Sequence, residues 1–330
     1  MKAAVSERQE WVDTARGIGI ILVIYAHALR GQVVSGAFDP AWHADMQDAV
    51  IYAFHMPLFF FLAGLFAQHS IRKPAHDFLR EKAVTIVYPY FLWSIVSVSL
   101  AMLAAGAVNN AVSNNAILNL WAEPVFQYWF LYALLICHLI TLVTRADWRI
   151  TAVLCGVSAL GLVPPSFGMG WLAMNYYVYF GLGILFAPYL LSVRVSNSVA
   201  MLVAVASILI FAASFVVTFP LPYRALVVGR AVLGVSATLS IAMLCAPWSR
   251  WLTVLGTASM AIYVLHTIFS AGVRIGLAAV GFTDDLIILV LGTLIGILMP
   301  FAIWMAAREY RLLRVLGLGA QPRRRQDISV

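Results

Sequence analysis

The chain has 330 residues, of which 63% are hydrophobic and only 11% are charged, against roughly a quarter charged in a soluble domain. A soluble fold of this length could not cover so much apolar surface, so the composition excludes an ordinary soluble protein and favours an integral membrane protein. The net charge of +7 does not indicate a nucleic-acid-binding protein, because the basic residues lie in short loops and in the C-terminal segment, as at the cytoplasmic side of a membrane.

Apolar runs long enough to cross a hydrocarbon layer of roughly 30 Å recur along the whole chain. They predict an all-α fold, a polytopic transmembrane helix bundle of about ten spans with no separate soluble domain. The predicted spans lie near residues 17–35, 50–68, 83–105, 124–144, 150–165, 170–190, 199–219, 225–246, 252–274 and 285–307. The fifth span is short and ends at Pro164-Pro165, so a merger of the fifth with the sixth would change the count.

The lysines and arginines alternate between successive loops, and this gives the bundle an orientation. If the N-terminus lies inside, the inner loops carry nearly all of the basic residues and the outer loops carry mainly aspartate and glutamate. The positive-inside rule therefore predicts that both termini are cytoplasmic, which favours an even number of spans. On this basis the chain divides into a cytoplasmic N-terminal segment (1–16), a transmembrane domain (17–307) and a basic cytoplasmic tail (308–330).

The first span carries a histidine deep in an apolar run. His27 follows Arg16 by eleven residues, so a helix would place it roughly 15 Å above that arginine, toward the middle of the membrane. An ionisable side chain at such a depth needs a partner, a cavity or a function. A histidine can take a proton from a hydroxyl near neutral pH. A structural histidine bonded to a neighbouring helix explains the position equally well.

Two further histidines are predicted at similar depths. His55 lies in the second span two residues before Pro57, which frees a backbone carbonyl and favours a kink. His266 lies in the ninth span, in Tyr263-Val264-Leu265-His266. The two histidines could share a cavity, and a kink packed among phenylalanines is the alternative for His55. His138, in the fourth span, has no companion motif and is interpreted as structural.

Three basic residues have two interpretations each. Arg80 and Lys82 lie in the inner loop before the third span, where they can hold phosphates but where the positive-inside rule also explains them. Arg230 lies within the eighth span, where a permanent cation needs an anion, a cluster of carbonyls or water. The alternative for Arg230 is a side chain that extends to the outer surface.

The cysteines do not indicate a metal site. Cys137, Cys155 and Cys245 lie in apolar stretches, their number is odd and they have no motif spacing. The sequence therefore supports neither a disulfide framework nor a zinc site, and we expect no metal.

Several motifs together resemble the acyltransferase 3 family, the membrane-bound O-acyltransferases that acylate bacterial surface carbohydrates. Residues 11–18 are similar to the opening Asp-x-x-Arg-Gly of the family, and Arg16 and His27 reproduce its Arg-x10-His spacing. Residues 54–64, 128–134 and 263–266 resemble its second-span, fourth-span and late Tyr-x-x-His motifs. The Phe-His-Met-Pro form of residues 54–57 is most similar to the branch described as fucose 4-O-acetylase-like.

The resemblance implies a bacterial inner-membrane enzyme that transfers an acyl group, most commonly acetyl, from cytoplasmic acetyl-CoA to a hydroxyl of a carbohydrate or glycolipid. It implies that His27 acts as a general base or takes the acyl group itself, and that Arg16 orients the donor or stabilises charge near the thioester. Besides acyl-CoA and the acceptor, membrane lipids are the expected partners.

The remaining candidates divide between the two sides of the membrane. Arg80 and Lys82 are approximate stand-ins for the Arg-x-x-Arg pair that many relatives use on the donor side, since Lys82 is followed by Ala83, Val84 and Thr85. His55, Arg230 and His266 are expected to line the acceptor side.

The principal alternative is a transporter or flippase of a polar or lipid-linked molecule, because buried histidines and arginines also mark substrate pathways. Against it stand the lack of a visible inverted repeat and the several transferase-like motifs.

Overall fold

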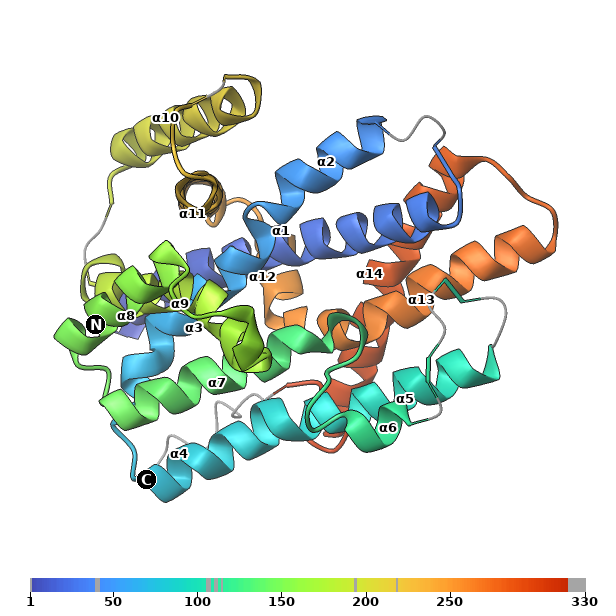
Figure 1. Ribbon diagram of the computed structural model, residues 1–330, viewed down its shortest axis with the longest axis horizontal. Helices are drawn as coiled ribbons and strands as arrows, with labels where there is room; N and C mark the ends of the chain where they lie inside the picture. Colours follow the sequence, from blue (N-terminus) through green and yellow to red (C-terminus); the bar gives the residue numbers. More distant parts are fainter. Residues whose placement is uncertain are drawn as a thin grey trace.

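The computed structural model describes residues 2–38, 42–104, 108–109, 112–113, 115–192, 195–217 and 219–319, with only the backbone described for 2–9 and 42. Every regular element in these ranges is helical, which confirms the predicted all-α fold (Figure 1). The elements are α1 (Lys2–Val34), α2 (Trp42–Tyr52), α3 (His55–Ile71), α4 (Ala75–Lys82), the π-helical turn η1 (Ala83–Val87), α5 (Tyr88–Leu103), α6 (Ala116–Asn119), the 3-10 turn η2 (Phe126–Tyr128), α7 (Trp129–Thr144), α8 (Trp148–Leu160), the 3-10 turn η3 (Pro165–Phe167), α9 (Met169–Leu190), α10 (Asn197–Val216), α11 (Tyr223–Cys245), α12 (Arg250–Thr257), α13 (Ser259–Ala279) and α14 (Asp285–Glu309).

Nine helical segments within the described ranges are long and apolar enough to cross a membrane, so the predicted polytopic bundle is confirmed. The predicted fifth span corresponds to α8, which has 13 residues and is shorter than the others. Asp147 caps α8 by accepting from the backbone N–H groups of Arg149 and Ile150, and Gly161 ends it with a φ of 66°. These two local signals make α8 short.

The long helices alternate in direction along the chain. Figure 1 shows α1 running from left to right, α3 returning to the left, α4 and α5 running to the right and α7 returning again. The α3–α4 and α7–α8 connections therefore lie at the same end of the bundle as the start of α1 (Figure 1). This is the arrangement expected of successive membrane spans joined by short loops.

The second and ninth predicted spans are each built from two helices. The second is α2 followed by α3, and the chain turns at Ala53 and Phe54. Pro57 lies in the first turn of α3, where its missing N–H would have no intrahelical partner in any case. The kink predicted near Pro57 is therefore a break between two helices, and the second helix begins at His55.

The short helix α12 packs closely against the first helix. A Cβ atom added at Gly256 would collide with the carbonyl oxygen of Asp13, and one added at Gly17 would collide with that of Leu252. Small residues at such crossings let two backbones approach without a side chain between them. The close approach fixes the inner part of α1, which carries Arg16.

Residues 310–319 fold back onto α5. Tyr88 donates to the carbonyl oxygen of Val315 at 2.5 Å, and Trp93 Nε1 donates to that of Leu316 at 2.9 Å. Leu313 and Leu318 are fully buried. The first part of the predicted basic tail is therefore packed, while residues 320–330 of that tail lie outside the described residues.

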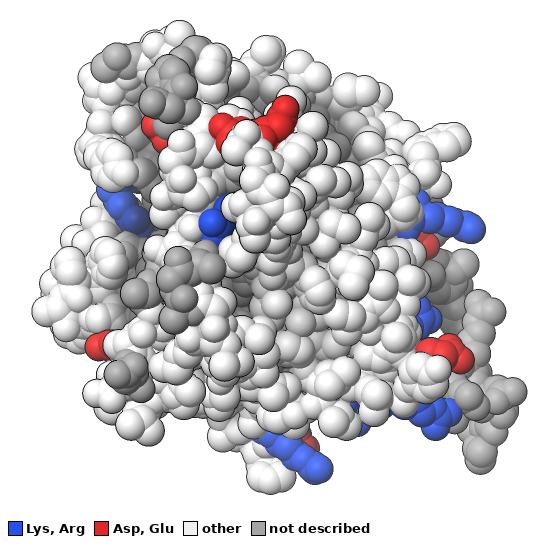
Figure 2. Space-filling view, turned by 90° about the vertical axis from the view of Figure 1, so that its right-hand side faces the viewer, with Lys and Arg blue, Asp and Glu red and all other residues white. Residues whose placement is uncertain are grey.

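The outer surface is largely apolar, as lipid contact requires. Many large hydrophobic side chains of α10 are exposed, among them Leu202 at 69% and Leu209 at 64%. Figure 2 shows one end of the molecule, where most side chains are uncharged and the acidic and basic residues lie in a few separate spots. An apolar exterior of this extent would be unstable in water and is matched to hydrocarbon.

Candidate functional site

Four helices bring four rings together, two of them fully buried and two partly buried. The ring centroids of His27 on α1 and His266 on α13 lie 5.1 Å apart. Tyr52, at the end of α2, packs 6.3 Å from His27 and 4.4 Å from His55, the first residue of α3. The structure thus places the three histidines that the sequence singled out in one cluster, with Tyr52 between His27 and His55. We call these four residues the histidine cluster.

Backbone carbonyls fix the orientation of two of these rings. Nδ1 of His55 lies 2.8 Å from the carbonyl oxygen of Ile51, and Nδ1 of His266 lies 2.7 Å from that of Tyr263. Both side chains are 0% exposed, and their Nε2 atoms have no hydrogen-bond partner among the described residues. Each ring therefore presents one uncommitted nitrogen to the interior.

His27 differs from the other two histidines. It is only partly buried, although its neighbours Ala26 and Ala28 on α1 are buried. His27 is therefore the histidine of this cluster whose side chain keeps accessible surface.

Arg30 belongs to this site, and the sequence analysis missed it. Its guanidinium donates from two nitrogens to the two carboxylate oxygens of Asp48, at 2.7 and 2.8 Å, and stacks over the ring of Tyr52, 3.0 Å from the centroid. A planar guanidinium that holds a carboxylate with two bonds and an aromatic face is a rigid arrangement. The sequence spacing could have indicated Arg30 as a site residue. His27 and Arg30 are three residues apart and therefore share one face of a helix, and Asp48 and Tyr52, four apart, share a face of another.

A small cavity lies beside the histidine cluster, on the side nearer the start of α1. It has a volume of about 90 Å³. Its lining is Val23, Met56, Phe59, Phe130, Ser259, Met260 and Tyr263. Val23 precedes His27 by one helical turn and Tyr263 precedes His266 by three residues, so the cavity lies about one helical turn from both histidines, neither of which is among its described lining residues. A narrow apolar slot of this kind can admit an unbranched chain but not a bulky charged group.

Arg16 does not contact the histidine cluster. It donates to Asp13 at 2.8 Å, and its guanidinium lies 5.7 Å from the centre of the Phe66 ring on α3. Arg16 lies about three turns, or roughly 16 Å, along α1 from His27. Any bound molecule that touches both residues must therefore be elongated.

The two basic residues predicted for the donor side have different environments. Lys82 is 8% exposed and lies 3.6 Å from a carboxylate oxygen of Glu81 and 5.3 Å from the centre of the Phe78 ring. Arg80 is exposed. The π-helical turn η1 begins directly after Lys82. Because the Lys82 side chain faces the protein and the Arg80 side chain faces outward, the two do not form a joint phosphate-binding pair in this structure.

Arg230 is directed toward α10. Its guanidinium donates to Oγ of Ser214 at 3.1 Å and to the carbonyl oxygen of Ser214, and it lies 4.2 Å from the centre of the Phe215 ring. The polar partners that a cation in a span requires are thus supplied by the neighbouring helix. The structure does not bring Arg230 together with the three histidines.

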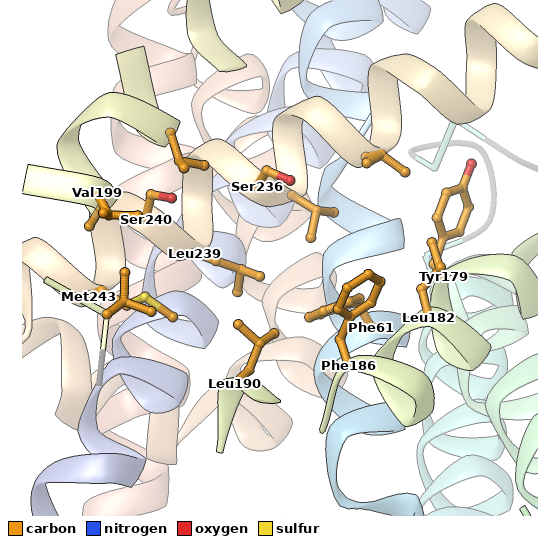
Figure 3. Close-up of a pocket in the computed structure, with 15 residues that line it drawn as sticks. Phe61, Tyr179, Leu182, Phe186, Leu190, Val199, Ser236, Leu239, Ser240 and Met243 are labelled. Carbon is orange, nitrogen blue, oxygen red and sulfur yellow. The ribbon is translucent and has the colours of Figure 1, made fainter. Parts of the chain in front are cut away.

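A larger cavity of about 330 Å³ lies between α3, α9, α10 and α11 (Figure 3). Figure 3 shows apolar side chains such as Phe61, Phe186 and Leu239 along it, with the hydroxyls of Tyr179, Ser236 and Ser240 as its polar groups. Among the described residues, its lining includes no histidine, carboxylate or basic residue. Its chemistry suits an apolar chain.

Comparison with known proteins adds a family to this geometry. A family model described as an acyltransferase domain matches residues 9–306. A nodulation protein NolL of Sinorhizobium fredii is 32% identical over 190 residues, which cover 56% of this chain and 50% of the relative. A nodulation protein NolL of Mesorhizobium japonicum is 28% identical over 188 residues, which cover 56% and 49%. The chain spans about half the length of these curated relatives, and no solved structure matches it.

Proposed function

The chain belongs to the acyltransferase 3 family, and from this premise we propose that it moves an acetyl group from acyl-CoA to a hydroxyl of a carbohydrate. The observation that carries the proposal is the partly exposed His27, whose ring centroid lies 5.1 Å from that of His266, one helical turn beyond the cavity-lining Val23. Acyl transfer to a hydroxyl needs a base or a nucleophile at the reacting carbon. An imidazole in a cavity can serve as either.

We propose that the donor enters from the end of the bundle where α1 begins. The loop before α4 and the segment between α7 and α8 lie at this end and are basic, so this end is the one that the positive-inside rule assigns to the cytoplasm (Figure 1). The nucleotide part of acetyl-CoA would stay at the surface, where the exposed Arg80 can meet its phosphates, whereas Lys82 is buried beside Glu81. The pantetheine arm would extend into the bundle and carry the thioester to His27.

In this proposal Arg16 contacts the donor between the nucleotide at the membrane surface and the thioester carbon at His27. The roughly 16 Å between Arg16 and His27 exceeds the reach of one side chain but is spanned by an elongated arm. Arg16 already binds Asp13, which holds the guanidinium in place. A preorganised cation there can orient the donor at no further entropic cost.

The acceptor would approach the other side of His27, where Arg30, Asp48 and Tyr52 form a polar and aromatic wall. Charged and aromatic groups of this kind can hold the hydroxyls and the apolar ring face of a sugar. His55 and His266 complete this side of the site. Arg230 is left out of the proposal because its contacts are with α10.

A transporter or flippase is the alternative that the sequence raised. The sequence shows no inverted repeat of the kind from which many transporters are built. Membership of an acyltransferase family also favours chemistry over transport. We therefore propose the transferase, acting in the cytoplasmic membrane of a bacterium.

The proposal is tested by mass spectrometry of surface and exported glycans from cells that do and do not carry the intact gene. We expect one class of glycan to lose the mass of an acyl group when the gene is deleted and to regain it on complementation. Complementation with His27→Ala should not restore that mass. Unchanged glycan and lipid-linked precursor masses, together with loss of a lipid-linked molecule from the outer leaflet, would support the flippase instead.

A further inference from the structure

The histidine cluster contains more acid–base groups than a single transfer step at His27 would use. We propose that His27 receives the acyl group and that His266 takes the proton of the attacking hydroxyl. This inference rests on the proposed function and assigns separate roles to two rings whose centroids lie 5.1 Å apart. His266 would then be a catalytic residue.

The backbone of α13 fixes the tautomer of His266. A carbonyl oxygen only accepts hydrogen bonds, and Nδ1 of His266 lies 2.7 Å from that of Tyr263 and 3.2 Å from that of Ile262. Nδ1 must therefore donate and carry the proton of the neutral ring. Nε2 is left with the lone pair, which is what a general base requires.

The environment of Nε2 of His266 also leaves this atom free to accept a proton. It is buried, has no hydrogen-bond partner among the described residues, and belongs to a side chain that is 0% exposed. A buried polar atom without a partner is costly and calls for an explanation, such as a bound group. Because the centroid of the His266 ring lies 5.1 Å from that of the His27 ring, an acyl group attached to His27 would be close to the His266 ring.

His55 has the same backbone arrangement but a different neighbour. Its Nδ1 lies 2.8 Å from the carbonyl oxygen of Ile51, and its ring meets the edge of Tyr52 at 4.4 Å. Tyr52 in turn packs against His27 and under Arg30. His55 therefore supports the wall of the site through Tyr52, whereas His266 contacts His27 directly.

The two steps balance in atoms and charge. A ring nitrogen of His27 attacks the thioester carbon, the C–S bond breaks, and the ring's remaining proton goes to the departing thiolate to give free CoA. The acceptor hydroxyl then attacks the acyl carbon and its proton goes to Nε2 of His266. The C–N bond breaks, and His27 leaves and recovers a proton from His266. Both rings return to the neutral state.

The experiment measures the formation and the lifetime of an acyl-enzyme in the purified full-length protein. Protein in detergent is mixed with acetyl-CoA labelled in the acetyl group, separated from free donor, and left in buffer, with glycerol as a hydroxyl probe or with hydroxylamine. Hydroxylamine is a strong nucleophile that needs little help from a base. Wild type, His266→Ala, His266→Gln and the control His138→Ala, a buried histidine packed between Phe78 and Phe180 outside the proposed site, are compared, each after size-exclusion chromatography to select folded protein.

We expect label on wild type at His27, and label on both His266 variants. Loss of the label to water and glycerol should be about a hundredfold slower in the His266 variants, since a general base typically contributes 10²–10⁴-fold, while hydroxylamine removes it from all proteins. His138→Ala should lose its label at close to the wild-type rate.

Three results would overturn the inference: no label on wild type, no label on folded His266→Gln, or wild-type loss of label from both His266 variants. None of these touches the proposed function, which fails instead if His27→Ala transfers acetyl to the cellular glycan as well as wild type does. If His266→Ala does not fold, the Gln variant decides.

Discussion

Substitution of Arg16 by lysine distinguishes two roles for this residue, a cation at the membrane surface and a group that binds the donor. If Arg16 only marks the inner surface, Arg16→Lys keeps the charge and should be tolerated. We expect instead a sharp loss of turnover, or a raised KM for acetyl-CoA, because a lysine cannot reproduce the planar guanidinium that is held by Asp13. The measurement is steady-state kinetics in vesicles with a fixed acceptor. Wild-type values of both parameters would return Arg16 to the status of a membrane anchor.

Arg30 should influence the reaction through Tyr52. Replacement of Arg30 by Met removes both bonds to Asp48 and the cation over the Tyr52 ring, so that ring is no longer held against His27 and His55. We expect kcat to fall by about tenfold or more, since small displacements at a reacting centre can cost up to about 100-fold. The KM for acetyl-CoA should stay close to that of wild type.

A control for this prediction is Arg308→Met, which changes a cation beside Trp304 at the far end of α14. It should leave kcat unchanged. An unchanged kcat in Arg30→Met would show that Tyr52 keeps its position without the guanidinium.

At the level of single residues, the sequence predicted the histidines but not their surroundings. His27, His55 and His266 could be found because ionisable groups are rare in apolar runs and because they recur in family motifs. Arg30 lies near the end of the first span, where a cation needs no special partner, so the sequence does not mark it as part of a site. Its pairing with Asp48 depends on how α2 folds back along α1, which no local pattern states.

Among the helices, the contact between α1 and α12 is the one most sensitive to a single methyl group. Gly256→Ala would push a Cβ into the carbonyl oxygen of Asp13, so we expect a loss of stability of about 1–3 kcal/mol, the usual cost of overpacking. The measurement is thermal unfolding in detergent.

The matched control is Gly276→Ala on α13, where an added Cβ meets nothing within 4 Å. It should be neutral or stabilising by up to about 1 kcal/mol, because alanine favours a helix over glycine. Equal effects of the two substitutions would mean that α1 and α12 are not tightly packed.

The α10–α11 pair gives Arg230 a structural role. Arg230→Met removes the bonds to Ser214 and the contact with Phe215, so we expect a lower unfolding temperature, with KM values for donor and acceptor close to wild type. A large rise in the acceptor KM with unchanged stability would instead support the acceptor-side role that the sequence suggested.

The sequence predicted which segments form long helices more accurately than it predicted where those helices begin and end. Long apolar runs gave all of the long helices, since hydropathy alone decides which segments can span a membrane. The kink predicted near Pro57 appears as the break between α2 and α3, whereas the break between α12 and α13 was not predicted. Both breaks fall inside apolar runs, at Ala53-Phe54 and Ala258, where no glycine or proline marks the turn itself.

For the whole molecule, the side of the membrane on which each loop lies can be measured directly. We expect His76→Cys, at an exposed site between α3 and α5, to be shielded from an impermeant thiol reagent in intact cells and labelled after permeabilisation. Glu123→Cys, between α6 and α7, should be labelled in intact cells. Reversed labelling would exchange the proposed donor and acceptor sides.

The family and the all-α membrane architecture were predictable from the sequence as a whole, because motifs spread over most of the chain and composition both point to them. The number of spans was less certain. Nine long helices and the 13-residue α8 are found in the described residues, so cytoplasmic placement of both termini requires α8 to cross as well. The length of α8 is set by the Asp147 cap at its start and by Gly161 at its end. A prediction from hydropathy alone takes no account of these capping residues.

The account depends most on His27 as the group that acts on the acyl carbon. The direct test is acetyl transfer from labelled acetyl-CoA in membrane vesicles of the producing cells, with wild type, His27→Ala and the matched control His138→Ala, whose ring is buried between Phe78 and Phe180. We predict that His27→Ala inserts normally and loses several orders of magnitude in rate, and that His138→Ala stays within a fewfold of wild type. Substantial transfer by His27→Ala would contradict the account and move the catalytic role to another residue.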